Sequence, residues 1–437
     1  MRDTFLGNGI LKIVYNEEGS MPIRTITTEP FPEKEMARSG NYKALLKKMN
    51  GAPREGLYVG KIGFLTELYM EKPPTLIKEI EAYDMGFSFS GGSSNIYPQA
   101  FKIAEKLAPR SHPHTLLSTA DKQVMIHVIV LNAGETSRHG ETNRVLNMDA
   151  DAVWYVHQGN GVCATSLGWI EFRTGDFIYI PARVCHKFVA TNDTVGGKVI
   201  MVGMESAGGF EAPERRVIDN IDIPYSSGDV RLPNPDYLSE FDNPDNSPSG
   251  GMDKSYAVFV KRDNEWNRIV YPETPFQCVA WRGYVYPFAI HASDLHFAYT
   301  TAIHPDPSNF ALFAAKDMSA VLSVLGPRYV HSLPYNHLNQ WEEALFYARD
   351  YEAREGSAIG AGDMTLHPQG VWHGPQIHAL HNWKTPERAE WRDELAIMFE
   401  AAKPLLLCED GERIRVPGYE RSWYESWEEY QESQKEK

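Results

Sequence analysis

The sequence predicts a chain dominated by β-structure and built around two β-barrels, with an N-terminal extension and a C-terminal helical tail. Two groups of short β-branched and aromatic runs are separated by Gly, Asn and Asp turns, which is typical of antiparallel sandwiches or barrels and not of a βαβ fold. One motif occurs in both groups with identical internal spacing, which indicates that the barrels are duplicates.

Five segments are expected along the 437 residues. Residues 1–122 mix β and α patterns, and 123–205 form the first barrel. The stretch 206–255 is rich in Pro, Asp, Ser and Gly, and we interpret it as a linker. The second barrel is expected over 256–400, followed by a charged tail over 401–437 that we expect to be helical.

Charge and cysteine content exclude several classes of protein. Lys and Arg number 43 and Asp and Glu 58, a formal net charge of −15, which argues against nucleic acid or an anionic membrane as the main partner. The sequence contains no run of 18 uncharged apolar residues, so no membrane span is predicted. The four cysteines are scattered and form no C-x-x-C pair, so we expect a protein of the reducing cytoplasm.

The repeated motif delivers a histidine after a short strand. It runs from Gly175 through Pro181 to His186 in the first region and from Gly362 through Pro368 to His373 in the second. A Gly-Asp turn, an apolar strand and a proline turn form a unit that aims the histidine into a barrel.

A metal site is predicted in the second barrel from His337, Glu343 and His373. His337 and Glu343 are six residues apart, and on one strand an even separation places both side chains on the same face. Glu342 competes for this role, but its odd separation from His337 would turn it to the opposite face. Two imidazoles and one carboxylate hold a divalent ion and leave positions open, which suits Fe(II) with substrate and O2, although Zn(II) is chemically possible.

The first barrel lacks this set. It keeps His186, but Arg183 stands where the second copy has Gly370, and no H-x-N-x-x-x-E precedes it. Asp149 and Asp151 are alternative ligands, but with one histidine they match no familiar site. We interpret the first barrel as a degenerate copy kept for structure or assembly.

The second half of the chain resembles one enzyme family closely, and the first half more thinly. The motifs that carry this resemblance are PFQCVAWRGYVYPF (275–288), HPDPSNF (304–310), LPYNHLNQWEEALFY (333–347), DYEAREG (350–356) and GDMTLHPQGVWHGP (362–375), supported by GLYVGKIGFLTELYMEKPPT (56–75) and YVHQGNG (155–161). The chain resembles the cupin superfamily, as a double cupin with two jelly-roll-type barrels, and within it the homogentisate 1,2-dioxygenase family.

The resemblance implies roles for particular residues. His337, Glu343 and His373 fall on the iron ligands, and His304 falls on the active-site acid/base histidine. Tyr351 falls on the tyrosine that faces substrate and bound oxygen. Tyr335 and His367 fall on substrate-pocket positions. A substrate carboxylate would need a cation, for which Arg282, Arg328 and Arg349 are candidates.

The function implied by the resemblance is Fe(II)-dependent opening of the aromatic ring of homogentisate with O2, giving maleylacetoacetate. The family's N-terminal G-F-G-N-E signature is absent, so hydroquinone, a substituted hydroquinone and gentisate stay open as substrates. A non-redox isomerase or hydrolase with Zn(II) or Mn(II), and a binding or storage protein, are the other hypotheses. The resemblance also implies a homo-oligomer, trimer or hexamer, with Trp423 and Trp427 in the tail as candidate contacts.

Overall fold

The structure is a computed structural model of the 437-residue chain. It describes the strands at 4–6, 9–14, 23–27 and 55–59 together with residues 65–70, 72–90, 96–133, 140–191, 196–211, 225, 227–234, 242, 255–295, 309–384 and 388–435. Most of the predicted linker at 206–255 therefore lies outside the described residues.

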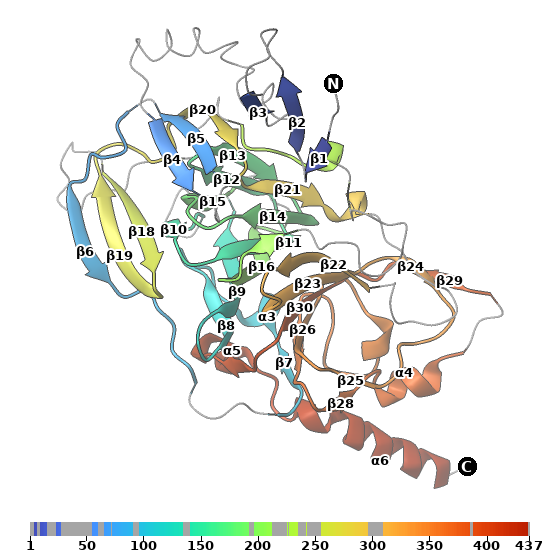
Figure 1. The fold of residues 1–437 in the computed structure, drawn as a ribbon. Helices are drawn as coiled ribbons and strands as arrows, with labels where there is room; N and C mark the ends of the chain where they lie inside the picture. Colours follow the sequence, from blue (N-terminus) through green and yellow to red (C-terminus); the bar gives the residue numbers. More distant parts are fainter. Residues whose placement is uncertain are drawn as a thin grey trace.

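Three seven-stranded sheets organise the described chain (Figure 1). The first sheet has the order β13 (Gly168–Phe172), β12 (Gly161–Thr165), β15 (His186–Ala190), β10 (Arg144–Asn147), β18 (Tyr256–Arg262), β19 (Glu265–Tyr271) and β6 (Glu79–Tyr83). The second has the order β21 (Phe288–His291), β14 (Asp176–Ile180), β11 (Asp151–Gln158), β16 (Lys198–Ser206), β9 (Val124–Asn132), β8 (His114–Thr119) and β31 (Leu405–Leu407). The third has the order β17 (Phe210–Glu211), β22 (Asn309–Ala315), β23 (Ala320–Leu325), β30 (Ala396–Ala401), β26 (Glu342–Tyr347), β27 (Met364–His367) and β7 (Gln99–Phe101).

Smaller elements complete the fold. Short sheets are formed by β1 (Thr4–Leu6), β2 (Gly9–Val14) and β3 (Ile23–Thr27), by β4 (Glu55–Val59), β5 (Leu65–Met70) and β20 (Cys278–Gly283), by β24 (Arg328–Val330) with β29 (Glu390–Arg392), and by β25 (His337–Leu338) with β28 (Trp372–His373). The described helices are α3 (Ile103–Lys106), α4 (Ile377–Asn382), α5 (Glu409–Ile414) and α6 (Ser422–Lys435), with 3-10 turns η1 (Ser227–Asp229), η2 (Ala292–Asp294), η3 (Glu352–Arg354) and η4 (Tyr419–Arg421). None of these helices is long and apolar enough to cross a membrane.

The second sheet is buried on both faces, which explains its sequence. One face packs with the first sheet around a core that includes Ile129, Trp154 and Phe188. The other face packs against the third sheet, where Val128 and Val153 share a core with Phe346. Strand β9 is consequently a nearly unbroken apolar run, because neither of its faces meets solvent. The first barrel is thus formed by the first and second sheets, and the second barrel by the third sheet with its short neighbours.

The predicted fold class, two jelly-roll-type barrels with a helical C-terminal tail, is confirmed. The strand pairing nevertheless differs from the segment boundaries that the sequence predicts. Strands β18, β19 and β21 lie within the range expected for the second barrel, yet they join the sheets of the first: β18 pairs with β10, β19 with β18, and β21 with β14. Strand β7, from the N-terminal segment, instead extends the third sheet beside β27. These pairings join distant parts of the chain, which local hydrophobic periodicity cannot reveal.

The C-terminal helix packs on its own chain. The indole nitrogen Nε1 of Trp423 donates to the carbonyl oxygen of Pro375 at 3.1 Å, and the guanidinium of Arg354 lies 6.0 Å from its ring centroid. Trp427 remains 43% exposed. Trp423 is therefore used within the chain, and the expected homo-oligomer stays a prediction.

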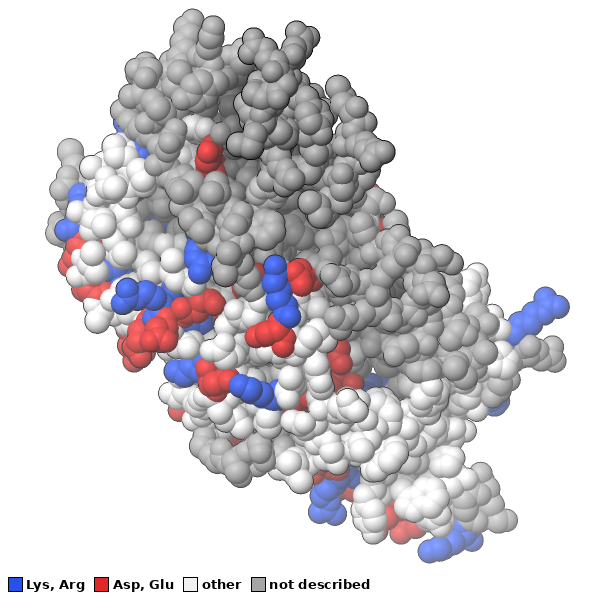
Figure 2. Space-filling view, viewed as in Figure 1, with Lys and Arg blue, Asp and Glu red and all other residues white. Residues whose placement is uncertain are grey.

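The surface agrees with the acidic composition. Arg268, on β19, pairs with Glu81, on β6, at 2.7 Å. Figure 2 shows Lys and Arg interspersed with Asp and Glu over the described part of the face that it draws. The charges drawn there do not form a broad basic patch of the kind that nucleic acid requires.

Candidate metal centre

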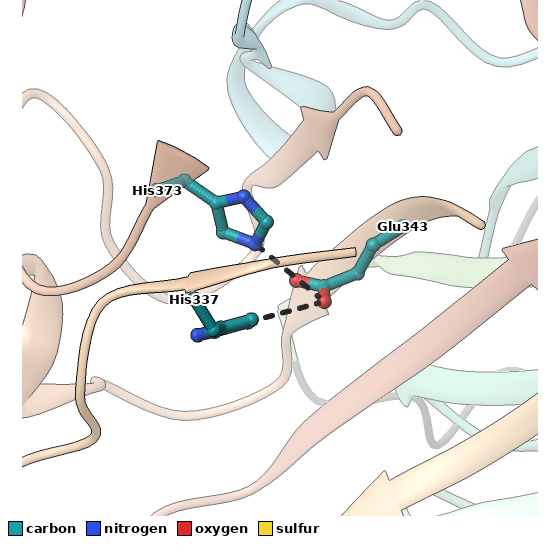
Figure 3. A group of neighbouring side chains, drawn as sticks. All are labelled: His337, Glu343 and His373. Carbon is teal, nitrogen blue, oxygen red and sulfur yellow. Dashed lines mark ion pairs between the residues drawn. The ribbon is translucent and has the colours of Figure 1, made fainter. Parts of the chain in front are cut away.

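A two-stranded ribbon brings two histidines together inside the second barrel. Strand β25 pairs with β28 so that His337 lies directly opposite His373, and the centroids of their rings are 4.4 Å apart. In Figure 3 both rings turn toward the carboxylate of Glu343, the second residue of β26. One ligand atom from each of the three residues lies within 4.8 Å of the others.

Backbone hydrogen bonds set the tautomer of both histidines. Nδ1 of His337 donates to the carbonyl oxygen of Tyr335 at 2.9 Å, and Nδ1 of His373 donates to that of Val371 at 3.0 Å. The proton is therefore on Nδ1 in each ring, and the lone pair is on Nε2. The two Nε2 atoms lie 3.9 and 3.8 Å from Oε2 of Glu343, so all three donors face one region.

The chemistry of this donor set fits a divalent metal ion. Histidine ligands are usually neutral imidazoles whose other ring nitrogen donates a hydrogen bond to a carbonyl group. Two of them with one carboxylate occupy one side of an ion and leave other positions for substrate. The sequence prediction that these three residues converge is matched by their positions, and their role as ligands belongs to the proposal below.

Glu343, and not Glu342, lies beside the two histidines, but the argument from even spacing that predicted this is wrong. His337 and Glu343 lie on two different strands, because β25 ends at Leu338 and β26 begins at Glu342. Glu342 points away and accepts a hydrogen bond from the backbone N–H of Gln369 at 3.2 Å.

Two side chains hold the Glu343 carboxylate in place. His367 is fully buried and its Nδ1 donates to Oε1 of Glu343 at 3.0 Å. Nδ2 of Asn339 donates to Oε2 at 2.7 Å and lies 3.3 Å from Nε2 of His373. The sequence analysis assigned no role to Asn339, although it is the polar residue of the H-x-N-x-x-x-E motif. A bound ion would take the place of these Asn339 contacts, since it needs the same two atoms.

The electrostatics keep the carboxylate ionised. Burial alone would raise the pKa of Glu343, but the neighbouring imidazoles of His337, His367 and His373 outweigh it and lower this pKa well below its usual range. The nearby carboxylate of Glu343 raises the pKa of His337. Burial lowers the pKa of His367 to about 3, so this ring is neutral and its Nδ1 proton stays available to Glu343.

A buried arginine, which the sequence analysis did not single out, backs His367. Arg354 is the last residue of the 3-10 turn η3 and is 6% exposed. Its Nε donates to the hydroxyl of Tyr347 at 2.6 Å, its Nη1 to the carbonyl oxygen of Gly374 at 2.9 Å, and its Nη2 lies 3.5 Å from Nε2 of His367. Because Arg354 donates toward Nε2 of His367, that nitrogen carries the lone pair. The proton is then on Nδ1, which donates to Glu343. Arg354 lies in DYEAREG, which was noted only for Tyr351.

Comparison with known proteins identifies relatives of the chain. No protein-family model matches it. "Putative dioxygenase SSO1533" of Saccharolobus solfataricus is 30% identical over 292 residues, which cover 64% of this chain and 70% of that protein. Homogentisate 1,2-dioxygenase of Emericella nidulans is 21% identical over 72% of this chain and 74% of that protein, and the Drosophila melanogaster enzyme is 24% identical over 69% and 71%.

The chain belongs to the homogentisate 1,2-dioxygenase family of cupins. It is a dioxygenase-type protein. Among solved structures, the Lactobacillus farciminis oxalate decarboxylase formate complex aligns with 73% of this chain and 89% of that chain at 10% identity and a TM-score of 0.33. A cupin 2 conserved barrel domain protein from Leptotrichia buccalis aligns with 69% and 91% at 9% identity and a TM-score of 0.30.

The other site residues expected from this family lie in different surroundings. His304 is outside the described residues. Tyr335 is 50% exposed. Its backbone carbonyl oxygen accepts a hydrogen bond from Nδ1 of His337. The buried hydroxyl of Tyr351 lies 3.4 Å from Nη2 of Arg328. The substrate roles of these three residues stay predictions.

The arginines considered for a substrate carboxylate are engaged elsewhere. Nη2 of Arg328 lies 3.0 Å from Oε2 of Glu394, in the interior. Arg349 forms an exposed ion pair with Asp393. The side chain of Arg282 lies outside the described part of the chain.

The first barrel has the same framework without the same ligands. His186 pairs with Val145 as His373 pairs with His337, and its Nδ1 likewise faces a carbonyl two residues earlier, that of Val184 at 3.2 Å. On the neighbouring sheet Ile180 pairs with Ala152, as His367 pairs with Glu343.

The counterparts of the three ligand candidates are therefore Val145, Ala152 and His186. The two acids that were alternatives there bind backbone N–H groups instead: Asp149 accepts from Asp263 and Asn264, and Asp151 accepts from Ala182 and Phe210. Of the three residue types that form the candidate metal centre, this barrel retains one, the histidine.

We expect His186 to make the protein less stable in acid. Burial lowers the pKa of His186 to about 4, whereas an unfolded histidine titrates near 6.5. Between these values the unfolded chain binds a proton that the native chain does not, so the free energy of unfolding falls as pH drops, by up to about 1.4 kcal/mol per pH unit from this residue. Urea unfolding from pH 4 to 7 should show a shallower dependence in His186→Gln. If the free energy of unfolding fell with pH equally steeply in the variant and the wild type, this expectation would be contradicted.

We expect His367→Phe to weaken metal binding by roughly 10–100-fold, because it keeps a ring but removes the proton that orients Glu343. Titration of the metal-free protein with metal against a competing chelator measures the change. His378→Phe is a matched control, since His378 is 43% exposed on α4. Equal affinities in the two variants would show that His367 only fills space.

Proposed function

We propose that this protein is an Fe(II)-dependent ring-cleaving dioxygenase that opens a para-diol, with homogentisate as substrate and maleylacetoacetate as product. The observation that carries the proposal is the convergence of His337, Glu343 and His373 in a dioxygenase-family chain. An iron bound by these residues would supply adjacent open positions where a substrate oxygen and O2 meet.

The residues of the chain divide the remaining tasks. Glu343 contributes one negative charge against the two positive charges of the ion, so the centre stays cationic and favours a substrate phenolate. His367 and Asn339 orient that carboxylate. His304 is proposed to accept the proton of the second phenol, a task that suits the ordinary pKa of histidine at neutral pH.

The proposal needs a rigid pocket wall behind the ligands. Arg354 is buried and donates to Tyr347 and Gly374, so its charge is fixed on the protein side of His367. Fixed donors of this kind cost no rearrangement when charge develops in the reaction. Tyr351 is proposed to form part of the same wall through Arg328.

An oxygen-electrode assay tests the proposal. Protein loaded with Fe(II) under anaerobic conditions is given homogentisate, gentisate, hydroquinone or a substituted hydroquinone, and O2 is then admitted. We expect O2 consumption with the growth of a ring-opened ultraviolet chromophore, fastest with the true substrate. Turnover without O2, in protein holding Zn(II) or Mn(II), would instead favour an isomerase or hydrolase. A lack of O2 uptake with every para-diol would overturn the dioxygenase reading.

A further inference from the structure

The first barrel encloses a cavity at the place where its metal centre would be. The cavity measures about 90 Å³, several times the roughly 10–15 Å³ that one water needs. Its wall includes Ala152 and His186, two of the counterpart positions, together with Trp154, Phe188 and Phe87. Alanine in place of the ligand carboxylate leaves space there. The interior of a small β-barrel can hold one small ligand.

The aromatic wall has a definite orientation. Trp154 is 5% exposed and meets Phe188 edge to face, with their ring centroids 5.8 Å apart. A Cβ atom added at Gly203 would lie 2.5 Å from Cε3 of the Trp154 indole, so the ring rests on the bare backbone of that glycine.

Two polar groups of the wall lack partners of their own. Nε1–H of Trp154 is buried, and within the described chain no acceptor lies in hydrogen-bonding reach of it. The His186 ring uses Nδ1 on the carbonyl of Val184, which leaves the lone pair of Nε2. A buried donor without an acceptor is costly, so a ligand that supplies one is favoured. A hydroxyl both accepts and donates, and so it complements this donor and this acceptor.

The buried charged groups of the wall neutralise one another. Lys261 forms a buried ion pair with Glu205. Glu205 also accepts from Nδ2 of Asn147 at 2.7 Å, and its Oε1 lies 3.7 Å from Nε2 of His127. Because the buried lysine is already matched by a carboxylate, the interior of the wall offers no spare charge to an ionic ligand. Lys122 also lines the wall, but it is only half-buried and its ammonium lies 5.6 Å from the ring centroid of Phe87. An uncharged molecule would enter without the desolvation cost of an ion.

We propose that the first barrel is a second small-molecule site, which binds an uncharged hydroxylated aromatic compound with its ring against Trp154 and Phe188 and its hydroxyl near Nε1 of Trp154 and Nε2 of His186. This site is separate from the metal centre and does not depend on the reaction proposed there. It gives the degenerate copy a use in binding beyond its use in structure.

Fluorine NMR titration of the full-length protein tests the proposal, with 4-fluorophenol, fluorobenzene and 4-fluorobenzoate as probes. We expect 4-fluorophenol to saturate one site with the same affinity in chelator-treated and metal-loaded protein. Fluorobenzene, which lacks the hydroxyl, should bind more weakly, and the 4-fluorobenzoate anion should not compete. Absence of saturable binding, or tighter binding of 4-fluorobenzoate, would overturn the proposal.

Variants place the site in the first barrel. Ala152→Leu fills the cavity and should abolish the metal-independent binding while leaving O2 uptake by metal-loaded protein unchanged. Ala82→Leu adds the same bulk on the exposed strand β6 and should bind like wild type. Binding that survives Ala152→Leu would show that the probe lies elsewhere.

A second variant keeps the test decisive if Ala152→Leu does not fold. Trp154→Phe retains an aromatic ring and removes only the indole N–H. It should weaken the binding of 4-fluorophenol by roughly 3–10-fold, which corresponds to one neutral hydrogen bond, and leave the affinity for fluorobenzene nearly unchanged. Equal losses for both probes would mean that the N–H does not contact the ligand, which contradicts the proposed mode.

Discussion

Glu343→Gln should lose its metal and its O2 uptake together. The substitution keeps the shape of the side chain but removes the negative charge toward which both Nε2 atoms and Nδ1 of His367 are directed. Because loss of a mere supporting partner costs roughly 10–100-fold in metal affinity, loss of the ligand charge should cost more than about 100-fold. Metal content after dialysis and O2 consumption with homogentisate measure the two effects.

Glu342→Gln is the matched control for this experiment. The two glutamates are adjacent on β26 and both are buried, but Glu342 accepts from the backbone of Gln369 and faces away from the histidines. It should keep its metal and most of its activity. If Glu342→Gln lost metal and Glu343→Gln did not, the assignment of the carboxylate would be reversed. If neither variant lost metal, the ion would not be bound at this place.

The composition of the centre was predictable because it rests on short, ordered motifs. Each Gly-Asp turn, strand and proline turn presents its histidine through local backbone geometry, so His373 could be found from sequence alone. The pairing of Glu343 with His337 was reached through an assumption of one continuous strand, whereas a turn separates β25 from β26. The motif therefore predicted which side chains lie together, although its geometric explanation was wrong.

What sequence could not reveal depends on contacts between distant segments. The bond from His367 to Glu343 and the approach of Arg354 to His367 exist only after β26 and β27 pair. The cavity of the first barrel likewise needs Lys261, on β18, to reach Glu205, on β16. Neither periodicity nor spacing within one segment specifies such partners, because both report only on local structure.

Arg328→Met should destabilise the second barrel by about 3–5 kcal/mol, the cost of leaving a buried charge without its partner. Arg328 is 2% exposed and Glu394 is 7% exposed, and their closest atoms are 3.0 Å apart. Glu394 also accepts the backbone N–H of Glu352 at 2.8 Å, and this single bond would be left to hold its charge. Urea unfolding at neutral pH measures the loss.

Two further variants separate structure from substrate binding. Arg349→Met removes an exposed arginine paired with Asp393 and should cost less than about 1 kcal/mol. Adding Glu394→Gln to Arg328→Met should recover part of the stability, because the unpaired charge is then gone. If Arg328 instead bound a substrate carboxylate, Arg328→Met would unfold like wild type and raise KM for homogentisate but not for hydroquinone. Its burial against Glu394 favours the structural outcome, so the cation for such a carboxylate must be sought elsewhere in the pocket.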